Sequence, residues 1–251
     1  MRRDARYAPV QDGMPRAAAA VRYTELAPPE HLTEFVHCFW ELRTLEVLQE
    51  DFHYHALPDA CVNLLLNQQD PRIAGITALQ TTSVVLNLGT AFHYVGVQFY
   101  PGVWHGVPDE ITDAYVGTPY TGELPLVQTS EAMLGLQFVE QIPQLVALVE
   151  WCRAAGYVRP NALTARLLRQ LDRIRSVADM AAIAKLSTRQ LQRALKASCG
   201  FTPHDLLKVL RVQQSFRRHY LDLYSDQSHF IHAFREATGI TPVRYRDRYR
   251  A

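Results

Sequence analysis

Three polar side chains near residue 190 have the types and the spacing that read DNA bases. Gln192 and Arg193 follow Arg189 by three and four positions, so the three share one face of a helix, whereas Leu191 and Leu195 face inward. Arginine can form two hydrogen bonds with guanine in the major groove, and glutamine can do so with adenine. The pattern therefore predicts a helix that recognises DNA sequence.

A second set of residues has the types that bind metals. Alternation along a strand puts the imidazoles of His53 and His55 on one face, where two more ligands would complete a site. The candidates for those ligands are His93, His105, Asp59 and Glu110. Histidine is also a common half-buried residue, and we expect no metal here.

Aromatic residues of the same region favour an apolar core with a ligand pocket. They are Phe39, Trp40, Phe92, Tyr94, Phe99 and Trp104. Pockets for small molecules are mostly apolar with few polar anchors, so part of this set can line one. We expect ligand contacts from His53, His55, Phe92, Tyr94 and Trp104. Asp59 follows Pro58, which is typical of a turn former rather than a catalytic base.

The motifs of common enzyme classes do not occur in the sequence. It has no G-x-S-x-G, P-loop or dinucleotide motif. His37 and Cys38 are adjacent, which on a helix points their side chains apart and argues against a Cys-His nucleophile. The four cysteines form no C-x-x-C pair and are interpreted as reduced packing residues. We expect no catalytic residues, no cofactor and no enzyme activity.

Strands are expected in the first part of the chain and helices in the rest. Branched and aromatic residues cluster in 61–67, 81–89 and 94–102, with turn residues between them. Short strands at this spacing predict a small β-barrel or sandwich. From Ser130 onward the pattern is helical, and residues 156–160 form the expected linker. The clearest helical spacing is that of Leu145, Leu148, Val149 and Cys152.

A repeat in the second half predicts two related helices. Residues 187–203 and 226–242 align without a gap at an offset of 39 residues. Both copies begin with a helix-capping residue, Ser187 or Asp226, and end in Gly-(Phe/Ile)-Thr-Pro. The glycine suits a left-handed helix terminus, and the proline can open the next helix. We interpret the copies as two versions of one DNA-reading element.

The segment before the first copy predicts a supporting helix. Ser176 can cap it, Ala181 is small where two helices would cross, and Lys185 and Leu186 form a tight turn. This order is typical of a helix-turn-helix unit, whose second helix enters the major groove. A glycine is more usual than a lysine at position 185.

The charge of the chain is divided between its halves. Residues 1–158 carry 8 Lys and Arg against 18 Asp and Glu, and residues 159–251 carry 18 against 7. The second part therefore has a formal charge of +11, although the net charge of the chain is only +1. Such asymmetry indicates a domain that faces a polyanion, and its alternative is a solvated, arginine-rich helical face.

Residues 163–250 resemble the DNA-binding domain of AraC/XylS-type transcription regulators. The matching residues are Ala181, Leu186, Ser187, Leu191, Arg193, Leu195, Arg211, Phe234, Arg235 and Tyr245, with segments 200–203, 226–230 and 239–242. Segments 31–42, 57–67 and 95–102 resemble the N-terminal domain of a subgroup of these regulators. The resemblance implies a β-barrel-like sensing or dimerising domain joined to two helix-turn-helix units. It also implies RNA polymerase as a partner and activation of transcription.

The resemblance indicates which residues read bases. The sequence also departs from the family pattern at one point. DNA contacts are expected from Thr188, Arg189, Gln190, Gln192 and Arg193 in the first unit, and from Gln227, Ser228, Ile231 and His232 in the second. Only 15 positions separate Arg211 from Asp226, which is too few for a complete supporting helix. The position equivalent to Ala181 is the bulky Tyr220. We expect the second unit to be truncated or remodelled.

These observations predict an α+β protein: a small β-barrel or sandwich-like domain with flanking helices, then an all-α AraC-type helix-turn-helix domain. The expected parts are an N-terminal extension (1–22), a β-rich sensing or dimerisation domain (23–125), a helical segment and linker (126–160) and the DNA-binding domain (161–251).

The expected partners are double-stranded DNA, a small-molecule effector and a second copy of the chain. No apolar run is long enough for a signal peptide or a membrane span, so we expect a cytoplasmic protein without a membrane partner. The alternative is a metal-dependent cupin-like enzyme or metal sensor whose basic helical domain serves assembly.

Overall fold

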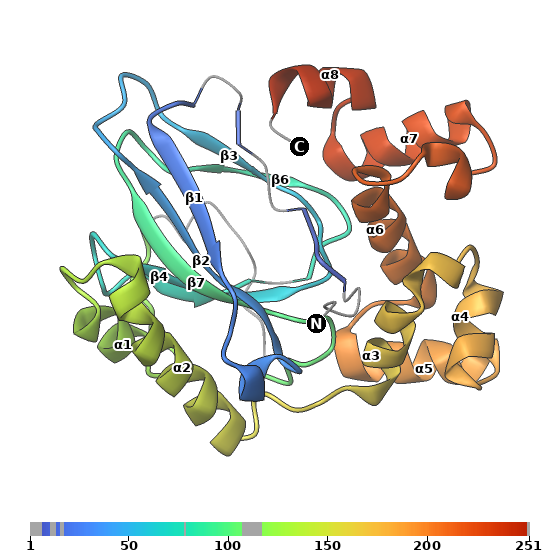
Figure 1. Ribbon diagram of the computed structural model, residues 1–251, viewed down its shortest axis with the longest axis horizontal. Coiled ribbons are helices and arrows are strands. Elements are labelled where there is room, and N and C mark those ends of the chain that lie inside the picture. Colours follow the sequence, from blue (N-terminus) through green and yellow to red (C-terminus); the bar gives the residue numbers. More distant parts are fainter. Residues whose placement is uncertain (1–6, 11–13, 16–17, 78, 107–116, 250–251) are drawn as a thin grey trace.

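The computed structural model describes residues 7–10, 14–15, 18–77, 79–106 and 117–249. Antiparallel strands come first and most helices follow, so the protein is α+β, as predicted (Figure 1). The strands are β1 Val21–Leu26, β2 Val36–Thr44, β3 His53–Ala56, β4 Val62–Asn67, β5 Ala74–Ile76, β6 Val84–Asn87 and β7 His93–Phe99. The α-helices are α1 Leu126–Ala132, α2 Phe138–Ala154, α3 Ala162–Arg169, α4 Val177–Ala184, α5 Thr188–Cys199, α6 Pro203–Ser215, α7 Gln227–Thr238 and α8 Pro242–Arg248.

The strands form two antiparallel sheets. The larger has the order β1-β2-β7-β4-β5, and the smaller pairs β3 with β6. Side chains of both sheets share one hydrophobic core, which includes Trp40, Leu86 and Tyr94. Strands β4 and β6 lie within the predicted segments 61–67 and 81–89, and β7 begins one residue before the predicted segment 94–102. Branched and aromatic side chains fit the pleated, half-buried surface of such strands.

His37 and Cys38 lie on strand β2, so the helix assumed for them is wrong. A register shift between Val36 and Cys38 interrupts the pairing of β2 with β7. His37 Nδ1 donates to Gln98 Oε1 at 2.7 Å, and Cys38 Sγ lies 3.8 Å from the same oxygen. Burial raises the pKa of the Cys38 thiol far above its usual range. The pair therefore packs around the buried Gln98 amide, and its thiol is not an activated nucleophile.

Helices α1 and α2 pack against the larger sheet on the side away from the smaller sheet. The predicted helical positions Leu145, Leu148, Val149 and Cys152 are all buried in this second core. After α2, Gly156 adopts a left-handed conformation with a φ of 83°, at the start of the predicted linker. A single bridge between Trp104 and Val158 then directs the chain toward α3.

Helices α3 to α8 lie along one side of the sheets (Figure 1). They form most of two further cores, one around α3 to α6, which also includes Ala60 and Cys61, and one formed mainly by α7 and α8. The predicted N-terminal extension contacts this half, since Tyr7 is buried in the first of these cores and Val10 N donates to Gln213 Oε1 of α6 at 2.7 Å. Among the helices that the structure describes, none has the length and apolar character needed to cross a membrane.

Candidate nucleic-acid interface and adjoining pocket

Helices α4 and α5 have the predicted order of a supporting helix, a tight turn and a capped second helix. Ser176 Oγ accepts from Asp179 N at the start of α4, and Ser187 Oγ accepts from Gln190 N at the start of α5. Ala181 is buried between them, where α4 contacts α5 and α6. Both helices thus begin at side chains that satisfy backbone N–H groups.

Lys185 forms the turn in a left-handed conformation, with φ 57° and ψ 43°. An L side chain in this region costs about 1 kcal/mol or more, whereas glycine adopts it freely. We therefore expect Lys185→Gly to raise the free energy of unfolding by about 0.5–1 kcal/mol after its larger unfolded-state entropy is subtracted.

Thermal denaturation tests this expectation, with Lys185→Ala as the control. The alanine variant removes the same side chain but keeps the left-handed strain, so its melting temperature should not rise. Equal melting temperatures for the two variants would show that the lysine side chain, and not the backbone, sets the stability of the turn.

Helix α5 divides the predicted residues between two faces. Leu191 and Leu195 are fully buried, whereas Arg189, Gln192 and Arg193 are exposed. Among the residues that the structure describes, neither arginine has a hydrogen bond or ion pair, so both guanidinium groups are available to a ligand. Lys196, one turn further along, extends the exposed face.

Two other predicted DNA contacts lie at the start of α5. Thr188 is exposed as its first residue. Gln190 is also exposed, but its Oε1 accepts from Ser187 N and from Ser187 Oγ, both at 2.9 Å. The side chain therefore completes a capping box, and its role in the structure is to fix the helix start.

Helix α7 repeats the architecture of α5. Both helices have 12 residues, and each ends at a left-handed glycine, Gly200 or Gly239. Asp226 Oδ1 accepts from His229 N at 2.8 Å and caps the start of α7. The exposed residues of α7 are Gln227, Ser228, His229, Ile231, His232, Arg235 and Glu236. Arg235 was not predicted as a contact, and neither was Lys196, its equivalent at the 39-residue offset.

The second unit has no supporting α-helix, as its short spacing predicted. Only a 3₁₀ turn, Tyr220–Asp222, occupies the place before α7. Tyr220 stacks on Phe230 with ring centroids 5.1 Å apart and planes inclined by 8°. Phe234 and Tyr245 continue this contact toward α8, at 5.6 Å from each other. An aromatic cluster therefore holds α7 in place of a second helix.

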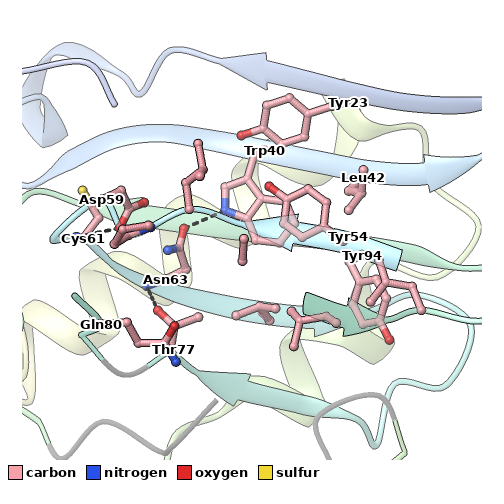
Figure 2. A pocket seen from close by; sticks show the side chains of 16 residues that line it. Tyr23, Trp40, Leu42, Tyr54, Asp59, Cys61, Asn63, Thr77, Gln80 and Tyr94 are labelled. Carbon is pink, nitrogen blue, oxygen red and sulfur yellow. Dashed lines mark hydrogen bonds between the residues drawn. The ribbon is translucent and has the colours of Figure 1, made fainter. Parts of the chain in front are cut away.

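A pocket lies between the two sheets (Figure 2). Its cavity volume is about 110 Å³, close to the size that holds a single aromatic ring. Four aromatic side chains line it, Tyr23, Trp40, Tyr54 and Tyr94. Its polar lining residues are Asp59, Cys61, Asn63, Thr77 and Gln80.

Only one of the five predicted ligand contacts lines this pocket. Tyr94 does, whereas Phe92 is buried in the adjoining core and His53 is exposed at the end of β3. Trp104 lies in the core on the other side of the larger sheet, where it stacks on Tyr157. His55 faces the helical half. The sequence shows that these side chains are aromatic or of a type that is often half-buried. It does not show which face of a sheet each of them occupies.

The candidate metal ligands do not come together. Within the described part of the chain, no three His, Cys, Asp or Glu side chains lie close enough to hold a metal ion. His93 Nε2 instead pairs with the buried Glu41 at 3.0 Å, and His105 is exposed. Glu110 lies outside the described residues.

Asp59 forms the predicted turn and also anchors a buried network. Its Oδ1 accepts from Cys61 N at 2.9 Å, and its Oδ2 accepts from Gln98 Nε2 at 2.7 Å. Since Gln98 also accepts from His37, the pocket wall is connected to the start of β2. Burial and the Asp59 charge raise the pKa of the Cys61 thiol, so the pocket cysteine is neutral.

His55 connects the smaller sheet to the helical half. Its Nε2 donates to Thr238 O at 2.9 Å, and its ring stacks on Tyr249 at 5.0 Å. Burial lowers the pKa of His55, and the charge of Arg248 lowers it further. Below its usual pKa of about 6.5, the unfolded chain therefore binds more protons at this residue than the folded protein does.

Lowering the pH below about 6.5 should therefore destabilise the protein. For this one proton, the free energy of unfolding should fall by at most about 1.4 kcal/mol per pH unit. The matched variant is His55→Gln, because its amide can donate to the same carbonyl but does not titrate. Chemical denaturation at pH 5 to 8 should show a smaller pH dependence for the variant. The pH dependence that remains should come in part from His37, because burial lowers the pKa of His37 as well. Identical pH profiles would contradict the assignment to His55.

The comparisons with known proteins concern the strand-forming part of the chain. Residues 24–110, about a third of the sequence, match a family described as a domain of unknown function (DUF6597). No curated protein matches the chain, and no solved structure does. The family match thus covers the strands around the pocket and does not include helices α3 to α8.

Proposed function

We propose that the protein is a sequence-specific, DNA-binding transcription regulator of the AraC/XylS type. The observation that carries the proposal is the exposed face of α5, on which Arg189, Gln192 and Arg193 lie opposite the buried Leu191 and Leu195. A capped supporting helix and a left-handed turn precede it, in the order of a helix-turn-helix unit. In this proposal α5 enters the major groove and its arginine and glutamine side chains pair with base edges.

The face of α7 supports a lesser role for the second unit. At the positions equivalent to Arg189, Gln192 and Arg193 it exposes Ser228, Ile231 and His232. None of these three has the fork of donors or the amide that pairs bidentately with a purine. The second helix then mainly contacts the DNA backbone.

We further propose that the strand-forming part is a sensing domain and that the pocket is its effector site. Contacts between the pocket walls and the helices support this. Pro58 O, in the loop before β4, accepts from Gln213 Nε2 of α6 at 2.8 Å. Ser83 N, just before β6, donates to Ala237 O of α7 at 2.7 Å. A ligand that moves these walls would therefore shift α6 and α7. In the same proposal the protein is a homodimeric activator that contacts RNA polymerase, which the resemblance implies.

Selection from a library of random duplexes tests the proposal. Repeated rounds with the full-length protein should enrich one sequence motif. A double variant, Arg189→Ala with Arg193→Ala, is the control, because it leaves both caps and the buried face of α5 intact. It should enrich no motif. If the wild-type protein enriches none either, it does not read sequence.

A further inference from the structure

The pocket between the sheets has flat aromatic walls. Trp40 from β2, Tyr54 from β3 and Tyr94 from β7 line it, and Tyr23 from β1 stacks on Trp40 at a centroid distance of 6.5 Å (Figure 2). The cavity volume of about 110 Å³ suits a single ring. Aromatic pairs in offset or edge-to-face contact gain free energy beyond the area that they bury. The walls therefore favour a flat aromatic ring over a thicker saturated one.

The Trp40 indole is held in a fixed position within these walls. Its Nε1 donates to Asn63 Oδ1 at 3.1 Å. The indole lies over its cross-strand partner Gly96, where a Cβ atom would come within 2.4 Å of Cζ2. A glycine in the middle of a buried strand weakens that strand, so its place beneath Trp40 has a use. It lets the indole pack against the backbone of β7 and form a wall of the cavity.

The bond from Trp40 also fixes the orientation of the Asn63 amide. An indole N–H can only donate, so the atom that faces it is Oδ1, and Nδ2 with its two hydrogens lies on the other side of the amide. Among the residues that the structure describes, no group accepts a hydrogen bond from this Nδ2. Asn63 is half-buried and lines the pocket. It therefore presents a fixed donor to an occupant of the pocket.

Gln80 brings a second amide to the pocket lining. It follows Thr77, which is joined to Asn63 by two hydrogen bonds of 2.8 and 2.9 Å. In Figure 2, Asn63, Thr77 and Gln80 lie toward one end of the pocket, and Tyr54 and Tyr94 lie toward the other. Within the described part of the chain, the Gln80 side chain has no hydrogen-bond partner. A ligand that displaces water from such amides without replacing its hydrogen bonds loses affinity.

We propose that the pocket binds an aromatic ketone or amide, about the size of a single substituted ring. The ring packs against Trp40 and the tyrosine rings. The carbonyl oxygen accepts hydrogen bonds from the side-chain amides of Asn63 and Gln80. The proposal rests on the proposed function in one respect, because the compound then acts as the effector of DNA binding.

The loop that carries Gln80 also contacts the helices of both units. Leu79 packs against the core around α3 to α6, and its Cδ1 lies 3.7 Å from the place that a Cβ atom of Gly200 would take at the end of α5. Ser83 N donates to Ala237 O of α7 at 2.7 Å. A ligand that fixes Gln80 therefore acts on α5 and α7 through one short segment.

Isothermal titration of the full-length protein without DNA tests the ligand class. Three probes of similar size separate the ring from the carbonyl group. Acetophenone has both, cyclohexyl methyl ketone has no aromatic ring, and α-methylstyrene has a methylidene group in place of the carbonyl oxygen. We expect acetophenone to bind roughly 3- to 10-fold more tightly than cyclohexyl methyl ketone, which is the gain from one aromatic contact. Equal binding of the two ketones, or no binding of acetophenone, would overturn the proposal.

The variant Gln80→Met locates the carbonyl group. It keeps the length of the side chain and removes the amide, which holds no other part of the described structure in place. Acetophenone should bind roughly 3- to 10-fold more weakly, the contribution of one hydrogen bond, whereas α-methylstyrene should not be weakened. Gln144→Met is the matched control, because Gln144 is exposed on α2 and does not line the pocket. Unchanged acetophenone binding in Gln80→Met, or an equal loss for both compounds, would contradict the assigned hydrogen bond.

A final titration separates this proposal from the proposed function. Acetophenone at saturation should change the affinity for the selected duplex at least about fivefold in the wild-type protein and not in Gln80→Met. Acetophenone binding without any DNA binding would reject the regulator and retain the pocket. DNA binding without acetophenone binding would reject the pocket and retain the regulator. Both binding events without mutual effect would reject the effector role.

Discussion

Raising the salt concentration should weaken the binding of the full-length protein to its selected duplex by several orders of magnitude. We expect the logarithm of the affinity to fall against that of the salt concentration with a slope of magnitude about 5 to 9. Each phosphate that Lys or Arg neutralises releases condensed counterions, and added salt opposes this release. Between about 50 and 200 mM KCl, such a slope lowers the affinity roughly 10³- to 10⁵-fold.

The internal contacts of the helical half explain why its positive charge stays available. Asp172 and Glu236 pair with Arg218 and Lys208 at 2.9 and 2.6 Å. Three further carboxylates accept backbone N–H groups at helix starts, those of Asp179, Asp205 and Asp226. Most acidic groups of this half are thus occupied in holding its own helices. The exposed basic side chains on and near α5 and α7 include Arg189, Arg193, Lys196, Arg235 and Arg244.

Fluorescence anisotropy at five or more salt concentrations measures the slope. Arg235→Ala should reduce the magnitude of the slope by about 1, because in the proposed complex this exposed side chain on α7 contacts one phosphate. Arg153→Ala is the matched control, since Arg153 pairs with Glu150 on α2 in the acidic half of the chain. A slope near zero for the wild-type protein would remove the electrostatic basis of DNA binding.

The parts of the fold that local chemistry specifies were predictable from the sequence. Helices α5 and α7 begin at Ser187 and Asp226 and end at Gly200 and Gly239, as the repeat indicated, because capping and left-handed termini depend on a few adjacent residues. The segment around His37 was not predictable in this way. Its strand is specified by pairing with β1 and β7, and β7 lies about 60 residues away in the sequence.

The two candidate sites differ in how far the sequence predicts them, for the same reason. The exposed face of α5 follows from helical periodicity alone, so Arg189 and its neighbours could be named in advance. The pocket depends on how two sheets meet. Asn63 and Trp40 come from different strands, and no spacing in the sequence shows that the amide of one fixes the indole of the other. One available signal was Gly96, since a glycine within a strand often marks a close approach.

Replacing Arg189 by alanine should cost about 1–3 kcal/mol in affinity for the selected duplex and relax the preference at one base pair. The reason is geometric. Arg189 projects from a helix that is capped at Ser187, packed on α4 through its buried face and preceded by a defined turn. A side chain on so rigid a support pairs with a base edge at little cost in entropy.

Replacing His232 by alanine should cost well under 1 kcal/mol and leave the sequence preference unchanged. His232 occupies the position equivalent to Arg193, but α7 offers Ser228 and Ile231 beside it, so the face as a whole lacks bidentate donors. Phe230 and Phe234 hold α7 in place through aromatic contacts, but they provide no such donors.

Anisotropy measurements of both variants with the selected and a scrambled duplex, at one salt concentration, distinguish the two helices. Arg173→Ala is the charge control. Arg173 lies before α4, its side chain is exposed, and it donates a hydrogen bond to Gln170 Oε1. It should weaken both duplexes equally and slightly, as the loss of one distant charge requires. Arg189→Ala should instead weaken the selected duplex much more than the scrambled one. If His232→Ala loses discrimination as strongly as Arg189→Ala does, then α7 reads bases despite its missing supporting helix, and the aromatic cluster around Tyr220 is a full substitute for that helix.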